Sequence, residues 1–276
     1  MFCRSRSYEF VVCRASYIFS MTDSFILLHG GTGAYFLDLE AELGPGTYRT
    51  IDTPYGPAGS IYLPDRWQGR LGLASRHGWG RLEVSPPFVN SRANLWAAKA
   101  LGARAILSWN GVGAINPLLE VHDLVVLDGI IDVTKTRVRS FNPPSDRPGA
   151  HHSLPSIERP FDPALSRAIY EVARADRIRA FPVGVYACSE GPRLETMAEI
   201  TALGRFGAEI VGMTLVPEVF LAAELGIPFA SLCYVTNYAT GVEPAPGAPR
   251  FFGVEVAQTC LRLLLRAVER IVDHLQ

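Results

Sequence analysis

The sequence has little of several features that mark particular classes of protein. Its five cysteines form no C-x-x-C pair, and no apolar run approaches the roughly 20 residues that a membrane-spanning helix needs. The net charge is only −1, so nothing in the charge suggests nucleic acid or an anionic membrane as a partner. There is no internal repeat and no low-complexity tract. The remaining composition, 48% apolar and 19% charged, is typical of a soluble globular enzyme.

The cysteines and histidines argue against a metal site. Cys188, Cys233 and Cys260 lie in apolar stretches, as buried reduced thiols of a cytoplasmic protein do. His151 and His152 are adjacent but have no carboxylate or cysteine at ligand spacing. We therefore predict no metal and a cytoplasmic location.

The first twenty residues differ from the rest of the chain. Glu9 and Arg14 interrupt what would be the apolar part of a signal peptide, and no clean cleavage site follows. Met21 is a plausible second start. We expect residues 1–20 to form an extension outside the fold, and residues 21–276 to form one domain.

Short apolar runs alternate with helical patterns along the rest of the chain. This alternation predicts a single three-layer α/β domain, with a mixed central sheet flanked by helices. A long loop rich in Pro, Ser, Gly and His covers residues 142–160. We expect strands at 25–28, 60–63, 72–75, 105–109, 124–128, 184–188 and 208–212 and before Asn237, and helices at 93–101, 162–175, 197–206, after Glu218, and at 254–275.

Glycines and cationic or polar side chains follow several of these strands. Thr32 lies in the glycine-rich stretch 30–33, Arg76 and His77 follow the strand at 72–75, and Asn110-Gly111 begins a second glycine-rich stretch. Each feature alone is equally consistent with a plain turn or a surface ion pair. Together they predict an anion site, because strand ends in α/β sheets expose free N–H groups and Arg binds phosphate well.

A second group of polar residues follows the later strands. Glu195 comes after the strand at 184–188, Met213-Thr214 after the next, and Asn237 ends the last. Glu195 could instead be a carboxylate that favours a helix start, and Asn237 a turn residue. We interpret the group as the second half of the same site.

Six motifs in order resemble the trimeric purine nucleoside phosphorylases, and in particular their methylthioadenosine and methylthioinosine phosphorylase branch. The resemblance runs from about Phe25 to the C-terminus. The motifs are Gly30-Gly31-Thr32-Gly33, Asp52-Thr53-Pro54-Tyr55-Gly56, Arg76-His77-Gly78, Asn90-Ser91-Arg92-Ala93-Asn94-Leu95-Trp96, Glu190-Gly191-Pro192-Arg193-Leu194-Glu195-Thr196 and Met213-Thr214-Leu215-Val216-Pro217-Glu218.

The resemblance implies a site for a nucleoside and inorganic phosphate, with phosphate as co-substrate and no other cofactor. It also implies a homotrimer or a dimer of trimers, in which a loop, here residues 148–155, completes a neighbour's pocket. The matching phosphate-binding residues are Thr32, Arg76, His77, Asn110, Gly111 and Thr214. The matching substrate-binding residues are Met213 at the ribose, Glu195 and Asn237 at the base, and Leu194, Val211 and Ala239. Asn237, Arg76 and His77 correspond to the catalytic group.

Two departures from the resemblance bear on the substrate. The adenine-specific branch has aspartates where this chain has Asn237 and Ala239. An asparagine can donate to O6 and accept from N7–H, and Glu195 can accept from N1–H, so both residues favour a 6-oxopurine. The segment 79–82 lacks a further histidine that is common there.

We therefore predict an enzyme of purine salvage that converts inosine, guanosine or 5′-methylthioinosine into free base and ribose 1-phosphate. A methylthioadenosine phosphorylase that tolerates asparagine and a non-catalytic nucleoside-binding relative remain open, and a hydrolase fits the cationic site less well. Residues 244–253 contain no histidine and include Phe251-Phe252, which favours a methylthio group at the 5′ position over a hydroxyl.

Overall fold

The structure is a computed structural model that describes residues 25–142, 157–244, 246–247 and 255–274. The predicted extension 1–20, the loop 148–155 and Phe251-Phe252 lie outside the described residues. Among the helices of the described ranges, none is long and apolar enough to cross a membrane.

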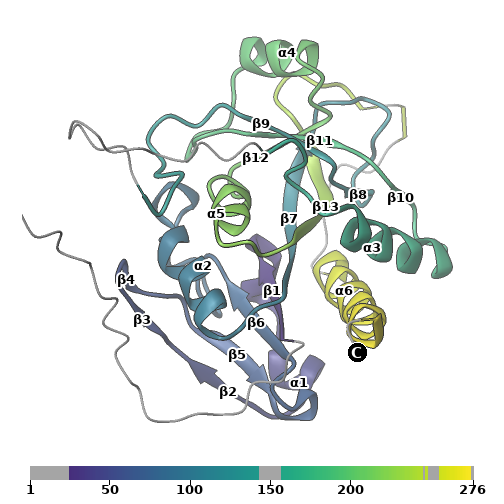
Figure 1. The fold of residues 1–276 in the computed structure, drawn as a ribbon. Coiled ribbons are helices and arrows are strands. Elements are labelled where there is room, and N and C mark those ends of the chain that lie inside the picture. The colour runs from purple at the N-terminus through teal and green to yellow at the C-terminus, as the bar shows by residue number, and fades with distance from the viewer. Residues whose placement is uncertain (1–24, 143–156, 245, 248–254, 275–276) are drawn as a thin grey trace, which may run out of the picture.

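One mixed sheet of eleven strands forms the centre of the molecule (Figure 1). Its main path is β10-β8-β13-β7-β1-β6-β5-β2, with β12 attached to β7, β11 to β12 and β9 to β11, while β3 and β4 form a separate pair. The strands are β1 (Ile26–Gly30), β2 (Gly46–Arg49), β3 (Asp52–Thr53), β4 (Gly56–Pro57), β5 (Ile61–Pro64), β6 (Leu71–Ser75), β7 (Ala105–Ala114), β8 (Leu124–Val126), β9 (Gly129–Asp132), β10 (Ala180–Phe181), β11 (Val185–Cys188), β12 (Ile210–Gly212) and β13 (Phe229–Tyr238).

The middle of the sheet is parallel and buried on both faces. β1 pairs in parallel with β6 and β7, and β7 pairs in parallel with β13. Every residue of β1 and β6 is buried, which explains why these strands are apolar runs rather than alternating patterns. The predicted α/β fold with a mixed sheet is therefore confirmed.

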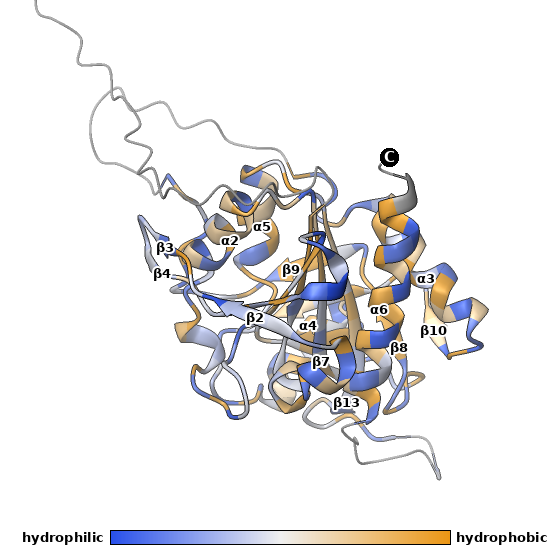
Figure 2. Cartoon of the chain, turned by 90° about the horizontal axis from the view of Figure 1, so that it is seen from below, coloured by the Kyte–Doolittle hydropathy of each residue, from blue (hydrophilic) through white to orange (hydrophobic). Residues whose placement is uncertain are grey.

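Helices cover both faces of the sheet, as Figure 1 shows. α2 and α5 pack together against one face, α3 and α6 against the other, and α4 caps the end formed by β11 and β12. In Figure 2 the apolar positions of α3 and α6 alternate with polar ones, as in helices that bury one face. The helices are α1 (Leu39–Leu43), α2 (Ser91–Ala100), α3 (Pro163–Ala175), α4 (Met197–Arg205), α5 (Glu218–Glu224) and α6 (Glu255–His274), with short 3-10 helices at Thr32–Phe36, Asp65–Trp67 and Pro86–Phe88.

The helix starts follow capping rules that can be read from the sequence. The Asp162 side chain accepts from the N–H groups of Ala164 and Leu165, ahead of a proline in the first turn of α3. Thr196 and Glu199 form a reciprocal capping box at the start of α4. These local signals are the reason that the predicted helix boundaries fall close to the observed ones.

One predicted boundary is wrong, and the difference matters for the site. We expected a strand at 105–109 followed by a glycine-rich loop, but β7 continues to Ala114. β13 pairs with β7 along this extension, and β12 pairs antiparallel with its last residues on the other side. Gly111 and Val112 pair with β13 alone, whereas Gly113 and Ala114 have backbone partners on both sides, so both glycines belong to a strand and not to a loop.

Candidate active site

Three strands bring distant residues into one row. Val211 of β12 faces Gly113 of β7, and Gly113 faces Asn237 of β13, just after an irregularity in β13 at Thr236. Val211 is buried and Asn237 is exposed. Strand register therefore places two of the predicted substrate-binding residues on either side of a glycine that leaves space between them.

A pocket opens over this row. It contains nine of the twelve predicted site residues and six that the sequence analysis missed. The nine are Thr32, Gly111, Leu194, Glu195, Val211, Met213, Thr214, Asn237 and Ala239, and the six are Pro86, Val112, Gly113, Gly212, Thr236 and Thr240. Gly113 and Gly212 could have been found from their places beside predicted residues, but no sequence signal marks Pro86 or Thr240.

Two glycines allow chain segments to approach closely at this pocket. A Cβ on Gly111 would lie 2.9 Å from Cγ2 of Thr236. Gly191 has φ +72°, and a Cβ there would lie 2.7 Å from Sδ of Met213. A larger residue at either position would displace a pocket-lining residue or its neighbour.

Asn110, Arg76 and His77 do not line the pocket, although the sequence analysis placed them at its phosphate site. Asn110 is 1% exposed and lies directly behind the lining. Its Oδ1 accepts from the Thr214 hydroxyl at 2.9 Å, and its Nδ2 donates to the hydroxyls of Ser108 and Ser231. Asn110 therefore holds Thr214 in place from behind.

His77 is buried, and only one of its two ring nitrogens has a hydrogen-bond partner among the described residues. Nδ1 lies 2.8 Å from the Val84 carbonyl, which can only accept, so Nδ1 carries the proton. Nε2 is buried and has no partner among the described residues. Burial lowers the pKa of His77, against the effect of the Val84 hydrogen bond, so the neutral ring presents Nε2 as an acceptor.

Arg76 has a partner that the sequence analysis did not consider. Its Nε and Nη2 bind the carboxylate of Glu218 at 2.6–2.8 Å, its Nη2 also donates to Ser108, and its Nη1 donates to the His29 carbonyl. Both charged side chains are fully buried. These bonds use four of the five guanidinium N–H groups, so Arg76 is not the uncommitted cation that we expected, and its contact with phosphate stays a prediction.

His29 completes a buried cluster with this pair. Its Nδ1 lies 3.5 Å from Oε2 of Glu218. Burial, reinforced by the positive charge of Arg76, lowers the pKa of His29 well below its usual value. With His29 neutral, the charges of Arg76 and Glu218 balance each other.

The base-reading candidates are held by neighbours in the chain. Glu195 is 8% exposed, and its Oε1 accepts a short hydrogen bond from the Ser189 hydroxyl. The Asn237 Nδ2 donates to the Tyr238 carbonyl at 2.9 Å, and its Oδ1 accepts from Thr236 at 2.7 Å. Since the Tyr238 carbonyl only accepts, the amide orientation of Asn237 is fixed.

Comparison with known proteins shows the family of this chain. The model of the family described as the phosphorylase superfamily matches residues 26–269. The chain belongs to the phosphorylase superfamily.

Individual relatives are named as purine or methylthioadenosine phosphorylases. A probable 6-oxopurine nucleoside phosphorylase of Dictyoglomus turgidum is 42% identical over 80% of this chain and 81% of its own. An S-methyl-5′-thioadenosine phosphorylase of Thermofilum pendens is 39% identical over 78% of this chain and 79% of its own. In structure, an adenosine/methylthioadenosine phosphorylase double mutant from Schistosoma mansoni, in complex with adenine, matches with a TM-score of 0.76 and 27% identity, over 90% of this chain and 91% of that one.

The segment 79–82, which departs from the resemblance, is anchored in this phosphorylase. Trp79 donates from Nε1 to the Ser60 carbonyl and packs edge-on against Tyr48. Arg81 is 81% exposed and pairs with Glu83. The tryptophan holds the segment against the fold, while Arg81 projects into solvent.

Proposed function

We propose that this phosphorylase catalyses the phosphorolysis of purine nucleosides in purine salvage, with a preference for 6-oxopurine bases. The products are the free base and ribose 1-phosphate, or its 5-substituted form. The observation that carries the proposal is one pocket lined both by Thr32, Gly111 and Thr214 and by Asn237 and Glu195.

The reaction requires both groups of residues at once. An oxygen of inorganic phosphate forms a bond to C1′ while the C1′–N9 bond breaks, and the electron pair moves onto the purine, which takes a proton or a hydrogen bond at N7. Phosphate needs fixed donors, and the departing base needs a polar partner out of water. The proposed chemistry needs no metal and no organic cofactor.

For the phosphate, Thr32, Gly111 and Thr214 supply polar groups at the pocket surface. His77 Nε2 is a buried acceptor with no partner in the described part of the chain, which suits the O–H of hydrogen phosphate. Arg76 retains one Nη1 N–H beyond its bonds to Glu218, Ser108 and His29, and this N–H is the donor that we assign to phosphate.

For the base, the orientation of Asn237 supports a 6-oxopurine. With one Nδ2 hydrogen on the Tyr238 carbonyl, the other remains to donate to O6, and Oδ1 can accept from N7–H. The Glu195 carboxylate can accept from N1–H. Adenine presents a donor at position 6 and an acceptor at N1, so the same two residues fit it poorly.

The test is release of free base with and without inorganic phosphate. Inosine, 5′-methylthioinosine, adenosine and 5′-methylthioadenosine are supplied in turn, and hypoxanthine or adenine is measured. We expect phosphate-dependent hypoxanthine release that exceeds adenine release. Phosphate-independent release would show a hydrolase, a preference for 5′-methylthioadenosine would show the adenine branch, and binding without turnover would show a non-catalytic relative.

We also propose a homotrimer or a dimer of trimers, a cytoplasmic location and a methylthio group at the 5′ position. The likeness to trimeric phosphorylases supports the assembly. Free, buried Cys188, Cys233 and Cys260 suit a reducing compartment, since burial raises the pKa of Cys188 and Cys233 to about 12 and keeps them as thiols. The apolar Phe251-Phe252 supports the methylthio group, and the methylthio substrates above test it.

A further inference from the structure

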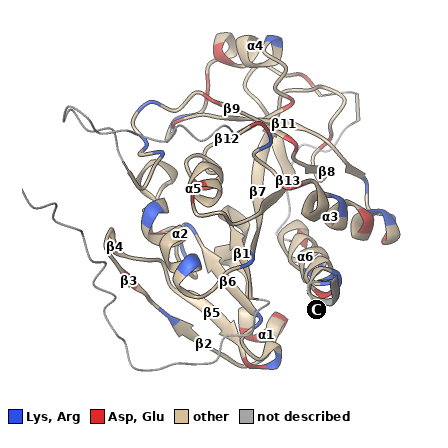
Figure 3. Ribbon diagram, in the orientation of Figure 1, with Lys and Arg blue, Asp and Glu red and all other residues tan. Residues whose placement is uncertain are grey.

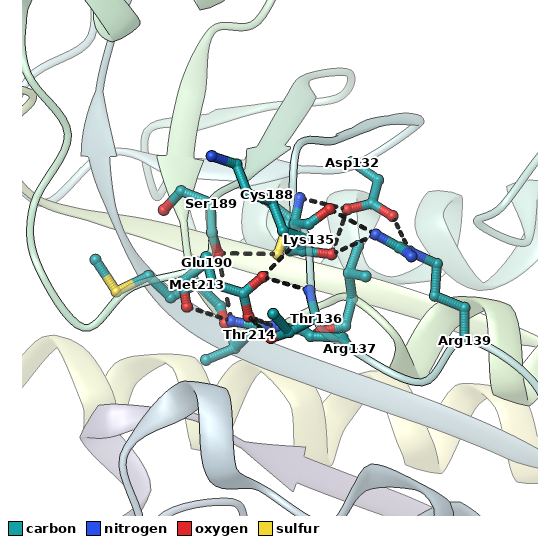
Figure 4. A network of polar contacts seen from close by, with 12 residues as sticks. Asp132, Lys135, Thr136, Arg137, Arg139, Cys188, Ser189, Glu190, Met213 and Thr214 are labelled. Carbon is teal, nitrogen blue, oxygen red and sulfur yellow. Dashed lines mark hydrogen bonds and ion pairs between the residues drawn. The ribbon is translucent and has the colours of Figure 1, made fainter.

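Arg137 joins two loops that carry pocket residues, as Figure 4 shows. Its Nη1 donates to the carbonyls of Met213 and Val216, both at 2.6 Å. Its Nη2 donates to the carbonyls of Ser189 and Glu190, at 3.3 and 2.8 Å. Its Nε donates to Oε1 of Glu190 at 3.2 Å. All five N–H groups are therefore used, and the side chain is only 5% exposed.

Glu190 ties its own loop, the one after β11, to the segment that carries Arg137. Its carboxylate accepts from the backbone N–H groups of Lys135 and Thr136 and from the Thr136 hydroxyl. Partial burial raises its pKa, but these N–H bonds and Arg137 outweigh that effect and lower the pKa to about 2. Glu190 is thus a carboxylate throughout the working pH range, and the Arg137–Glu190 contact is a charged one.

The position of the two loops explains why they need such a link. β9, β11 and β12 are adjacent parallel strands, and Arg137, Ser189 and Met213 lie just beyond their carboxyl ends. The Ser189 N–H still bonds to the Gly212 carbonyl, but past Ser189 the described loops share no further backbone hydrogen bond, so the sheet no longer fixes one loop against the next. The loop after β11 leads to Leu194 and Glu195, and the loop after β12 carries Met213 and Thr214.

We propose that Arg137 is a positioning residue, which sets the spacing between the base-reading Glu195 and the Met213-Thr214 segment that contacts ribose and phosphate. The inference rests on the proposed phosphorolysis. Arg137 lies outside the pocket lining and acts only through the four carbonyls and one carboxylate oxygen that it binds. Bond cleavage requires base, ribose and phosphate in one geometry, and a displacement of about 1 Å can cost on the order of 100-fold in rate.

Arg139 supplies a matched control. It lies two residues away and also pairs with a carboxylate, from Nε to Oδ2 of Asp132 at 2.5 Å. Its other hydrogen bonds go to Thr134, so among the described residues it bonds within its own segment and to neither of the pocket loops. Arg139→Ala removes a comparable charge and ion pair without releasing those loops.

The experiment compares the unchanged protein with Arg137→Ala, Arg137→Lys and Arg139→Ala, each checked for folding by circular dichroism and thermal melting. Lysine keeps the charge but offers three donors in place of a planar fork of five. We expect kcat for phosphorolysis to fall about 100-fold in Arg137→Ala and about tenfold in Arg137→Lys, with Arg139→Ala near the unchanged value. Calorimetric affinities for hypoxanthine alone and for phosphate alone should change by about threefold or less, because each half of the site stays intact.

A merely structural role would lower the melting temperature while the folded enzyme kept its kcat. Folded Arg137→Lys with kcat within about threefold of the unchanged protein, or no slower than Arg139→Ala, would overturn the inference. If Arg137→Ala does not fold, Arg137→Lys alone decides. A failure of the unchanged protein to release base in the presence of phosphate would refute the proposed function, and the positioning role with it.

Discussion

The guanidinium of Arg76 and the carboxylate of Glu218 form a fully buried ion pair, with Nη2 2.6 Å from Oε2. The two residues are 142 positions apart, at the end of β6 and the start of α5. Figure 3 shows that the central strands around them carry little charge. The pair joins the strand layer to a covering helix, and its two buried charges balance each other.

The first prediction concerns the stability of this pair. Arg76→Ala leaves the Glu218 carboxylate buried without its partner, which should lower the free energy of unfolding by about 3–5 kcal/mol. Replacing both, with Arg76→Met and Glu218→Leu, should restore much of that loss. Urea unfolding measures both effects. An equal loss in the single and double variants would show that the pair is not what stabilises this region.

The same variants separate structure from phosphate binding. We expect the folded double variant to have a raised KM for phosphate, because the remaining Nη1 N–H of Arg76 is gone while the net charge of the region is unchanged. An unchanged phosphate KM would remove Arg76 from the phosphate site and leave it a structural role only.

The second prediction concerns pH. The folded-state pKa values of His29 and His77 are lowered by burial from an ordinary value of 6.5. Below about pH 6.5 the unfolded chain binds protons that the folded chain does not, so stability falls as the pH falls. The slope is up to about 1.4 kcal/mol per pH unit for each histidine, until its lowered pKa is reached.

Unfolding curves between pH 7.5 and 5 measure this slope, and His29→Gln should make it shallower. Glu190 does not contribute there, since its stabilisation is lost only as the pH falls from about 4.5 toward 2. A stability independent of pH in this window would contradict the neutral, buried state of both histidines.

The third prediction concerns Gly111. In Gly111→Ala the new methyl group would lie 2.9 Å from Cγ2 of Thr236, the neighbour of Asn237. The displaced strand should lower kcat/KM about tenfold or more, because the base reader moves with it. Gly59→Ala is the control, since its nearest atom is 3.5 Å away and its φ is ordinary. Equal activity in the two variants would show that the approach at Gly111 does not matter.

The fourth prediction concerns base choice at Asn237. The unchanged enzyme should prefer 5′-methylthioinosine over 5′-methylthioadenosine by at least roughly tenfold in kcat/KM. Asn237→Asp places an oxygen against the Tyr238 carbonyl, where Nδ2 now donates. That oxygen should hold a proton, so the aspartic acid becomes a neutral group that suits adenine, and the preference should shrink or invert.

The measurement is kcat/KM for 5′-methylthioinosine and 5′-methylthioadenosine at pH 6 to 8, for the unchanged enzyme and for Asn237→Asp. The adenine activity of Asn237→Asp should fall as the pH rises and the new carboxyl loses its proton. An unchanged enzyme that prefers the adenine substrate would contradict the assignment of Asn237 and Glu195.

Local signals in the sequence determined much of this protein. The apolar runs at 25–28 and 72–75 are continuous because both faces of β1 and β6 are buried, and the caps at Asp162 and Thr196 set helix starts within a few residues. Polar residues at strand ends, together with the family resemblance, identified nine of the residues that line one pocket. These features depend on neighbours a few positions apart or on strand ends that share an edge, so a sequence pattern carries them.

Only the tertiary structure decided the rest. Glu218 became the partner of Arg76, Asn110 became the support of Thr214, and Arg137 reached five acceptors on two other loops, all over separations of 50 to 140 residues or so. The extension of β7 to Ala114 likewise depended on partners from β12 and β13. A charged or polar side chain takes whichever partner the packed chain brings within about 3 Å, and its own sequence neighbourhood does not contain that information.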